Sequence, residues 1–314
     1  MRKSSQNTPL VSVVMITYKH EAFIAEAIEG VLMQECDFEV ELIIADDNSP
    51  DKTSLIVSKY IETHPKGQWI KYTRHERNKG MMPNFIWALE QAKGKYIALC
   101  EGDDYWIDSS KLEKQVSFLE ANSNASLSYH PVKIINCRNH NEEIFTEPIK
   151  NATIEDAIKI QYFIHTSSIM YRAALLNISE YKIFRNVLFA DLALILSLLD
   201  KGVAGLILSE MSCYRLHDSG VTSTLNLSYP IYSIKVRKIF NKMTKFRYSN
   251  IIYKSTIDLL KIYSYNLQSS YKSLVIVKII LITNAFRFAF PLNIYQFKHF
   301  SYTFLIPKIY RFLK

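Results

Sequence analysis

The chain has 314 residues, of which 48% are hydrophobic and 22% are charged, and its net charge at pH 7 is +8. This composition excludes a disordered protein, and the length leaves room for one large domain with an appended segment. Four cysteines lie 64, 37 and 76 residues apart, a spacing that matches no zinc or redox motif, so we expect reduced thiols in a cytoplasmic protein. The polar start and the short apolar run at 11–16 do not have the form of a signal peptide.

The first 130 residues predict alternating strands and helices. Apolar runs at 11–16, 41–45 and 95–100 are short and rich in β-branched residues, as strands buried on both faces are. Between these runs, apolar residues recur at helical spacing, first at Ile24, Ala27, Ile28, Val31 and Leu32, and then at Phe85, Ile86, Leu89 and Ala92. Gly94 is placed to end the second helix. The pattern predicts an α/β fold with a parallel sheet.

Polar clusters follow the predicted strands, at 17–20, 46–49 and 101–104. Ligands of such sheets bind beyond the carboxyl ends of the strands, so we expect the clusters to form one site. The chain has no GxGxxG and no GxxxxGKS/T loop to hold phosphates at a helix N-terminus. The acids at 101, 103 and 104 instead offer hard oxygen ligands, which suit Mg²⁺ or Mn²⁺ held jointly by protein and substrate phosphates. A solvated strand end that caps the next helix is the alternative.

The charge is divided unequally along the chain. Residues 225–314 hold 15 Lys or Arg against the single acid Asp258, a net charge of +14, whereas residues 1–224 hold 23 against 29, a net charge of −6. We therefore expect two parts, 1–224 and 225–314. The second is predicted to be helical, basic and aromatic, and Lys278 and Arg287 interrupt its longest apolar stretch, so no membrane-spanning helix is expected.

A basic and aromatic segment of this kind suits the surface of an anionic membrane. The alternative is that its helices pack on the first part while their lysines face solvent. Nucleic acid ranks below both, because no zinc finger, helix-turn-helix or RNA-binding signature accompanies the charge.

Several sequence blocks carry a family resemblance. VSVVMITYKHE, IIADDNSPDKT, RNKGMMPNF and KYIALCEGDDYWIDSSKLEKQVSFLE resemble the nucleotide-sugar domain of family 2 glycosyltransferases with a GT-A fold. Further similarity at HTSSIMYR, FADLALILSLLDKG and SCYRLHDSGVTS extends the likeness over residues 9–224. It is closest to the bacterial branch that carries an EGDDYW block and serves surface polysaccharide synthesis. It implies a Rossmann-like, mostly parallel mixed sheet flanked by helices.

The resemblance implies a nucleotide-sugar site. Its residues would be Thr17, Tyr18, Asp46, Asp47, Asn78, Glu101, Gly102, Asp103, Asp104 and Arg215. Thr17 and Tyr18 hold positions that line the nucleoside pocket, although the flanking Pro and Asn of the family are Ile16 and Lys19 here. Asp46 matches an acid that accepts from a uracil-type base, and Arg215 is a candidate partner for a phosphate oxygen.

The resemblance also implies a metal site and a catalytic base. Glu101 and Asp103 hold the two ends of the family's DxD block, so the implied ligands of Mn²⁺ or Mg²⁺ are Asp103, Glu101 and His217. Asp191 lies 88 residues after Asp103, at the position of the family's catalytic acid. Without the resemblance, Asp191 is better interpreted as a helix N-cap and His217 as a loop histidine.

The implied activity is that of an inverting glycosyltransferase. It would move a sugar from a nucleoside-diphosphate sugar, UDP-linked for preference, to a hydroxyl of a saccharide or lipid-linked saccharide. The basic second part suggests that the protein works at the inner face of the plasma membrane. A metal-dependent nucleotidyltransferase is an alternative, but such an enzyme usually carries the phosphate loop that is absent here. A non-catalytic carbohydrate-binding protein or a membrane scaffold would require neither Asp191 nor a metal.

Overall fold

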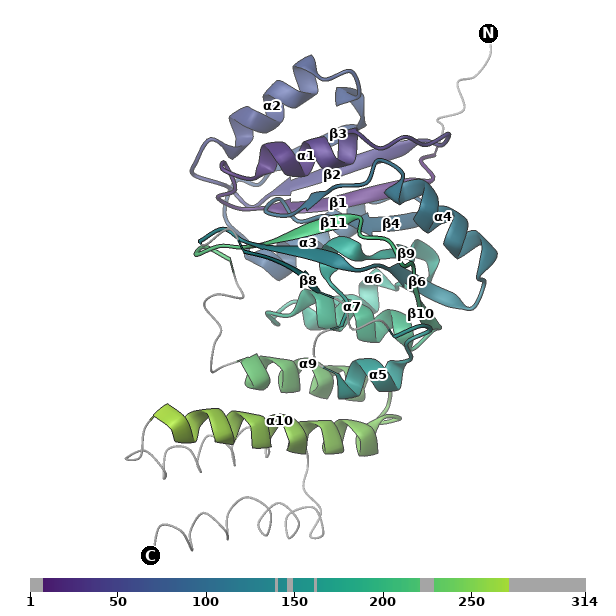
Figure 1. Cartoon of the computed structure of the whole chain (residues 1–314), viewed down its shortest axis with the longest axis vertical. Helices are drawn as coiled ribbons and strands as arrows, with labels where there is room; N and C mark the ends of the chain where they lie inside the picture. Colours follow the sequence, from purple (N-terminus) through teal and green to yellow (C-terminus); the bar gives the residue numbers. More distant parts are fainter. Residues whose placement is uncertain (1–7, 139–140, 146–148, 161–162, 221–228, 271–314) are drawn as a thin grey trace, which may run out of the picture. The chain divides into compact units, whose positions relative to one another are not determined.

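The computed structural model describes residues 8–138, 141–145, 149–160, 163–220 and 229–270. The chain divides into two compact units, 1–224 and 225–314. The boundary lies where the acidic composition of the chain gives way to the basic one. Figure 1 shows the described elements in sequence order.

A seven-stranded sheet forms the centre of the first unit, in the order β10-β6-β9-β4-β1-β2-β3 (Figure 1). Its strands are β1 (Val11–Thr17), β2 (Val40–Asp46), β3 (Ile70–Arg74), β4 (Tyr96–Leu99), β6 (Ala125–Tyr129), β9 (Met170–Arg172) and β10 (Val203–Leu206). β1 is parallel to β2 and β4, and β2 is parallel to β3. Only β9 runs antiparallel to its neighbours within this sheet. The predicted mostly parallel, mixed sheet is confirmed.

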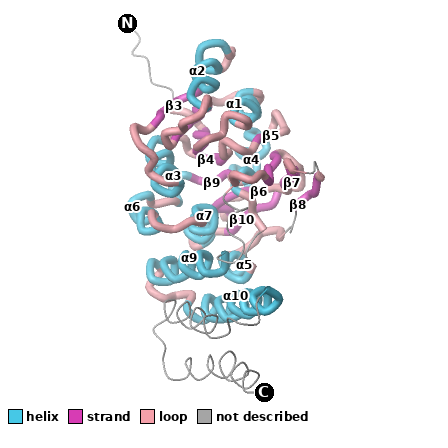
Figure 2. Tube along the Cα trace, turned by 90° about the vertical axis from the view of Figure 1, so that its left-hand side faces the viewer, coloured by secondary structure: helices cyan, strands magenta, loops and turns pink. Residues whose placement is uncertain are grey.

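Helices cover both faces of this sheet (Figure 2). They are α1 (Ile24–Leu32), α2 (Thr53–Thr63), α3 (Met81–Gln91), α4 (Lys111–Ala121), α5 (Ile154–Lys159), α6 (Ile178–Tyr181) and α7 (Ala190–Leu199). Short 3₁₀ turns lie at Gly67–Trp69, Thr166–Ser168, Ala173–Leu175 and Lys182–Phe184. α1 and α4 share one buried cluster with alternate residues of β1, whereas α3 contacts β1 and β2 outside that cluster.

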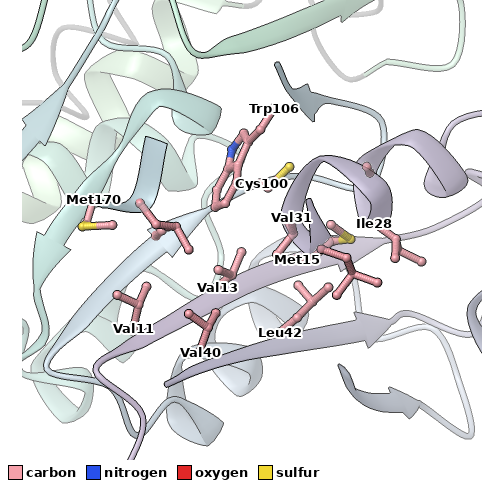
Figure 3. Close-up of a cluster of buried hydrophobic side chains, with 14 of the residues drawn as sticks. Val11, Val13, Met15, Ile28, Val31, Val40, Leu42, Cys100, Trp106 and Met170 are labelled. Atoms are coloured by element: carbon pink, nitrogen blue, oxygen red, sulfur yellow. The ribbon is translucent and has the colours of Figure 1, made fainter. Parts of the chain in front are cut away.

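The buried cluster beneath α1 explains why the first strand and helix form as predicted (Figure 3). Val13 and Met15 of β1 face Ile28 and Val31 of α1, and all four are fully buried. Burial of a side chain of this size stabilises the fold by about 1.5–3 kcal/mol. The cysteines take no part in crosslinks, since all four are free thiols.

The end of α3 differs from the prediction. The helix ends at Gln91 with Ala92 as C-cap, so Gly94 does not end it. Gly94 instead allows a close approach of two backbones, because a Cβ there would lie 2.5 Å from the Ser12 nitrogen. The Gly94 nitrogen also donates to Ser12 Oγ at 2.8 Å. Gly94 therefore serves backbone packing rather than helix termination.

A second, four-stranded sheet has the order β5-β11-β7-β8. Its strands are β5 (Tyr105–Trp106), β7 (Val132–Asn136), β8 (Glu142–Phe145) and β11 (Ser212–Leu216). β5 directly follows the acid block at 101–104 and pairs antiparallel with β11. This pairing brings the segment 215–217 to the acid block from more than 100 residues away in the sequence.

The described part of the second unit is a helical hairpin of α9 (Tyr229–Met243) and α10 (Ser249–Ser270). The two helices contact one another, and Ile234, Val236 and Phe240 on α9 and Ile252 and Ile257 on α10 are buried. No helix among the described residues is long and apolar enough to cross a membrane. Lys278 and Arg287 lie outside the described residues, so the interpretation of that stretch stays a prediction.

Candidate active site

The loops after β4, β1 and β2 meet at one edge of the large sheet, because these strands are neighbours and parallel. Backbone hydrogen bonds join the loops. The Gly102 nitrogen donates to the Ile16 carbonyl at 3.0 Å, and the Asp47 nitrogen donates to the Thr17 carbonyl at 2.9 Å. The three predicted polar clusters therefore lie side by side.

Asp103 is approached by two histidines. Nε2 of His217, which directly follows β11, lies 3.2 Å from Oδ2 of Asp103. Nε2 of His20, in the loop after β1, lies 3.6 Å from the same oxygen. Burial acts to raise the pKa of Asp103, but His20 and His217 outweigh it and hold that pKa below its ordinary value. Asp103 is thus the anionic member of the acid block.

Asp104 and Arg215 form the support of this loop. Oδ1 of Asp104 accepts a hydrogen bond from the backbone nitrogen of Arg215 at 3.0 Å. The guanidinium of Arg215 donates to the Asp103 carbonyl at 2.8 Å and forms an ion pair with Glu26. The guanidinium carbon lies 4.1 Å from the ring centroid of Tyr105. Burial lowers the pKa of Arg215 to about 10, so it stays charged at neutral pH. The guanidinium N–H groups of Arg215 donate to protein groups here. The implied contact of Arg215 with a phosphate oxygen of the donor stays a prediction.

Glu101 links the acid block to Asp191. Its carboxyl is buried, and Oε2 has no hydrogen-bond partner. Burial, followed by the charges of Asp103 and Asp191, raises the pKa of Glu101 to about 8. The charge of Asp191 thus contributes to the raised pKa of Glu101. Asp191 lies in the first turn of α7, and Phe189 takes the N-cap position, so the N-cap interpretation of Asp191 is wrong.

The acids after β2 organise their own loops. Asp46 is fully buried, and its oxygens accept from the Ser49 nitrogen at 2.7 Å and from the Tyr72 hydroxyl at 2.8 Å. The oxygens of Asp47 accept from the backbone nitrogens of Lys79 and Gly80 at 2.7 and 2.8 Å. A carboxylate has about four lone-pair sites. A further hydrogen bond from a nucleotide base to either carboxylate is therefore compatible with these bonds and stays a prediction.

Three other predicted residues border this edge. Tyr18 is 39% exposed. Asn78 Oδ1 accepts from the Gly80 nitrogen at 3.0 Å, in the loop that Asp47 holds. Thr17 Oγ1 is buried without a hydrogen-bond partner. Thr17 ends β1, Tyr18 follows it, and Asn78 lies in the loop between β3 and α3.

Sequence reasoning assigned no role to His20, Tyr72 or Glu26. His20 belongs to the polar cluster at 17–20, so the sequence predicts its place at the site but not its contact with Asp103. Tyr72 lies on β3, a strand that was not predicted, and Glu26 shows only the pattern of an exposed helix residue. Their contacts with Asp46 and Arg215 depend on tertiary packing.

The site partly fits a divalent ion. Two ligands at right angles, each about 2.1 Å from an ion, are about 3 Å apart, and His217 Nε2 lies 3.2 Å from Asp103 Oδ2. Nitrogen and oxygen donors suit Mn²⁺, and oxygen donors suit Mg²⁺. Yet no group of three or more His, Cys, Asp and Glu side chains is arranged to hold a metal within the part of the chain that the structure describes. The remaining ligands would come from phosphate or water.

A match to a family model decides the classification. The model of glycosyl transferase family 2 matches residues 12–178, more than half of the chain. The chain belongs to glycosyl transferase family 2. The uncharacterised protein Rv1520 of Mycobacterium tuberculosis is 35% identical over 212 residues, which make up 67% of this chain and 60% of that protein. The chain therefore spans about 60% of the length of this relative.

Other family 2 relatives and structures are similar over different extents. The UDP-Glc:alpha-D-GlcNAc-diphosphoundecaprenol beta-1,3-glucosyltransferase WfgD of Escherichia coli is 36% identical over 127 residues, 40% of this chain and 47% of WfgD. The crystal structure of S. aureus TarS 1–349 in complex with UDP has a TM-score of 0.65 at 19% identity, and the match covers 90% of this chain and 81% of that chain. The shared architecture confirms the expected GT-A fold.

Proposed function

We propose that the protein is an inverting glycosyltransferase. It transfers a sugar from a nucleoside-diphosphate sugar, with UDP as the first choice, to a hydroxyl of a saccharide or lipid-linked saccharide in surface polysaccharide synthesis. The observation that carries the proposal is the placement of Asp103, paired with His217, beside Glu101, whose carboxyl is influenced by Asp191. The candidate diphosphate site at Asp103 and His217 and the candidate catalytic base Asp191 would thus belong to one site.

Asp191 is the proposed catalytic base. It accepts the proton of the acceptor hydroxyl while that oxygen attacks the anomeric carbon from the face opposite the leaving diphosphate. Its place in the first turn of α7 favours the anionic carboxylate, because the N-terminal end of a helix is electropositive. The Leu192 nitrogen donates to Oδ1 at 2.7 Å and helps to orient the carboxyl group.

Asp103 and His217 are the proposed protein ligands of Mn²⁺ or Mg²⁺, and Glu101 remains the third candidate. A bound divalent ion would supply electrostatic stabilisation of the leaving diphosphate. Arg215 and Asp104 hold the loop that carries Asp103. The Asp46, Asp47 and Asn78 loops, with Thr17 and Tyr18, would receive the nucleoside.

The choice of donor and acceptor is supported by relatives. WfgD is named for a UDP-glucose donor and an acceptor on diphosphoundecaprenol, and TarS binds UDP in its structure. A nucleotidyltransferase or a non-catalytic binding protein would not account for membership in a glycosyl transferase family.

A thermal-shift screen of nucleotide sugars, with and without Mn²⁺, tests this function. Stabilisation grows with ligand concentration relative to Kd, by about 2.7 kcal/mol at 100 times Kd. We expect one UDP-sugar to raise Tm more than the other nucleotide sugars do, and to raise it further when Mn²⁺ is present. If no nucleotide sugar raises Tm at millimolar concentration, the protein does not bind the proposed donor.

We also propose that the second unit docks on an anionic membrane at the cytoplasmic face. The turn between α9 and α10 exposes 56% of Phe246 and has exposed Lys242, Lys245 and Arg247 around it. Lys245 and Phe246 both adopt positive φ angles, 52° and 64°. An exposed aromatic among cations is the composition that an interfacial contact requires.

A further inference from the structure

His20 is fixed in its loop from the backbone outward. The backbone nitrogen of His20 donates to Thr53 Oγ1 at 3.2 Å. Its backbone carbonyl accepts from the nitrogens of Phe23 and Ile24 at 2.9 and 2.8 Å, where α1 begins. Lys19 before it has a φ of 61°, a conformation that non-glycine residues adopt at a cost. Hydrogen bonds thus anchor the backbone of His20 at both its nitrogen and its carbonyl group.

The imidazole of His20 has two nitrogens in unlike surroundings. Nε2 faces Oδ2 of Asp103 at 3.6 Å. Nδ1 is buried and has no hydrogen-bond partner. It faces the α-carbon of Gly102, where a Cβ would lie 2.9 Å from Nδ1 and 2.8 Å from Thr17 Oγ1. Glycine at 102 therefore leaves the space that this imidazole occupies.

These surroundings decide which nitrogen carries the proton in the neutral ring. A proton on Nδ1 would be an unpaired buried donor, whereas a proton on Nε2 has a carboxylate as acceptor. His20 therefore offers an Nε2–H group to Asp103. The separation is longer than a hydrogen bond, as catalytic contacts often are before the ligand binds.

Nε2 of His217 lies 3.2 Å from the same oxygen. The planes of the two imidazole rings are inclined by 89°, and their centroids are 6.4 Å apart. In metal sites, a ligating carboxylate usually accepts a hydrogen bond from a residue that is not itself a ligand. We propose that His20 is a positioning residue that donates to Oδ2 of Asp103 and orients this carboxylate toward the cation and the donor diphosphate. This inference rests on the proposed function.

Binding of Mn²⁺ and UDP to the full chain tests the proposal without any turnover. His20→Ala should weaken Mn²⁺-dependent UDP binding about 10- to 100-fold, as loss of such a partner does elsewhere, and should leave Mn²⁺-free UDP binding unchanged. His20→Gln places an amide N–H near the position of Nε2 and should recover most of the affinity. His20→Asn reaches only the position of Nδ1 and should not.

The matched control is His64→Ala, because His64 also faces a carboxylate, Glu29 at 3.9 Å, but lies at the end of α2. It should bind like the parent. Equal affinity of His20→Ala and the parent, or a Gln variant as weak as the Ala variant with the same Tm, would overturn the inference. A parent that does not bind UDP with Mn²⁺ would instead refute the proposed function.

Discussion

At the scale of single residues, two adjacent carboxylates are given different chemistry by their surroundings. Asp103 meets two imidazoles, and its pKa is held below the ordinary value. Burial raises the pKa of Asp104 well above the ordinary value, and the charges of Asp103 and Glu101 raise it further. When the surroundings of two neighbouring acids shift their pKa values in opposite directions, the two acids usually have different chemical roles. We therefore propose that Asp103 binds the ligand, whereas Asp104 supports the loop through its hydrogen bond with the Arg215 backbone.

Replacing Asp191 by Asn tests its role as the base. The amide keeps the size of the side chain but cannot take a proton from the acceptor, so kcat should fall about 10²- to 10⁴-fold. Affinity for UDP with Mn²⁺ should not change, because Asp191 is not a proposed donor ligand. Steady-state kinetics and calorimetry measure the two quantities separately.

Asp200→Asn, at the other end of α7, is the control for this variant. It should retain kcat, because Asp200 pairs with Lys201 rather than with the acid block. Ordinary turnover by Asp191→Asn would remove Asp191 from the catalytic role.

At the scale of elements, β11 does most to assemble the site. Arg215 and His217 are two residues apart at its end, and they reach Asp104 and Asp103, respectively. The sequence predicted that loops of neighbouring parallel strands would meet, because strand order follows from the βαβ pattern. It could not predict the pairing of β11 with β5 from strand pattern alone, and only the resemblance placed His217 near Asp103.

The antiparallel strand β9 and the edge strand β3 also escaped sequence reasoning. β9 is three residues long, too short to show a period, and it enters the sheet between β4 and β6. β3 has partly exposed residues and no continuous apolar run. Short or half-exposed strands are specified by their partners more than by their own sequence.

Lys111, the first residue of α4, gives the fold a specific pH dependence. It is fully buried, its ammonium hydrogen-bonds to Gln115 and lies 4.2 Å from the Trp106 ring centroid, and burial lowers its pKa from 10.5 to about 7. Between these two values the unfolded chain binds a proton that the folded chain does not. This group therefore adds stability as pH rises from 7 toward 10.5, and below pH 7 its full burial penalty remains.

Lys111→Met should remove this contribution. The free energy of unfolding of the parent should rise more steeply between pH 7 and pH 9 than that of the variant, by up to about 1.4 kcal/mol per pH unit. Urea titrations at several pH values measure the slopes. Lys114→Met, whose ammonium is partly exposed beside Asp108, should keep the slope of the parent, and parallel curves for the parent and Lys111→Met would contradict the assignment.

At the scale of the whole molecule, charge is divided unequally between the two units. The first 224 residues have a net charge of −6 and carry the candidate active site, whereas the remaining 90 have a net charge of +14. A membrane surface with anionic lipids attracts each nearby Lys or Arg by about 1 kcal/mol. A docked enzyme would meet lipid-linked acceptors in two dimensions.

The full chain carrying Lys245→Glu and Phe246→Ser tests this docking. Cosedimentation with phosphatidylglycerol vesicles should fall about ten-fold or more relative to the parent. The control pair Leu55→Ser and Lys59→Glu also removes an exposed apolar residue and a lysine, but from α2, and should cosediment like the parent. Equal cosedimentation of the two double variants would contradict docking through the α9–α10 turn.

We propose that Asp103, with His217, binds a divalent ion that offsets the negative charge of the donor diphosphate. Calorimetric titration of UDP into the parent and Asp103→Ala, each with and without Mn²⁺, tests this proposal. We predict that Mn²⁺ tightens UDP binding to the parent and has no effect on the variant. Equal enhancement by Mn²⁺ in both proteins would contradict the claim.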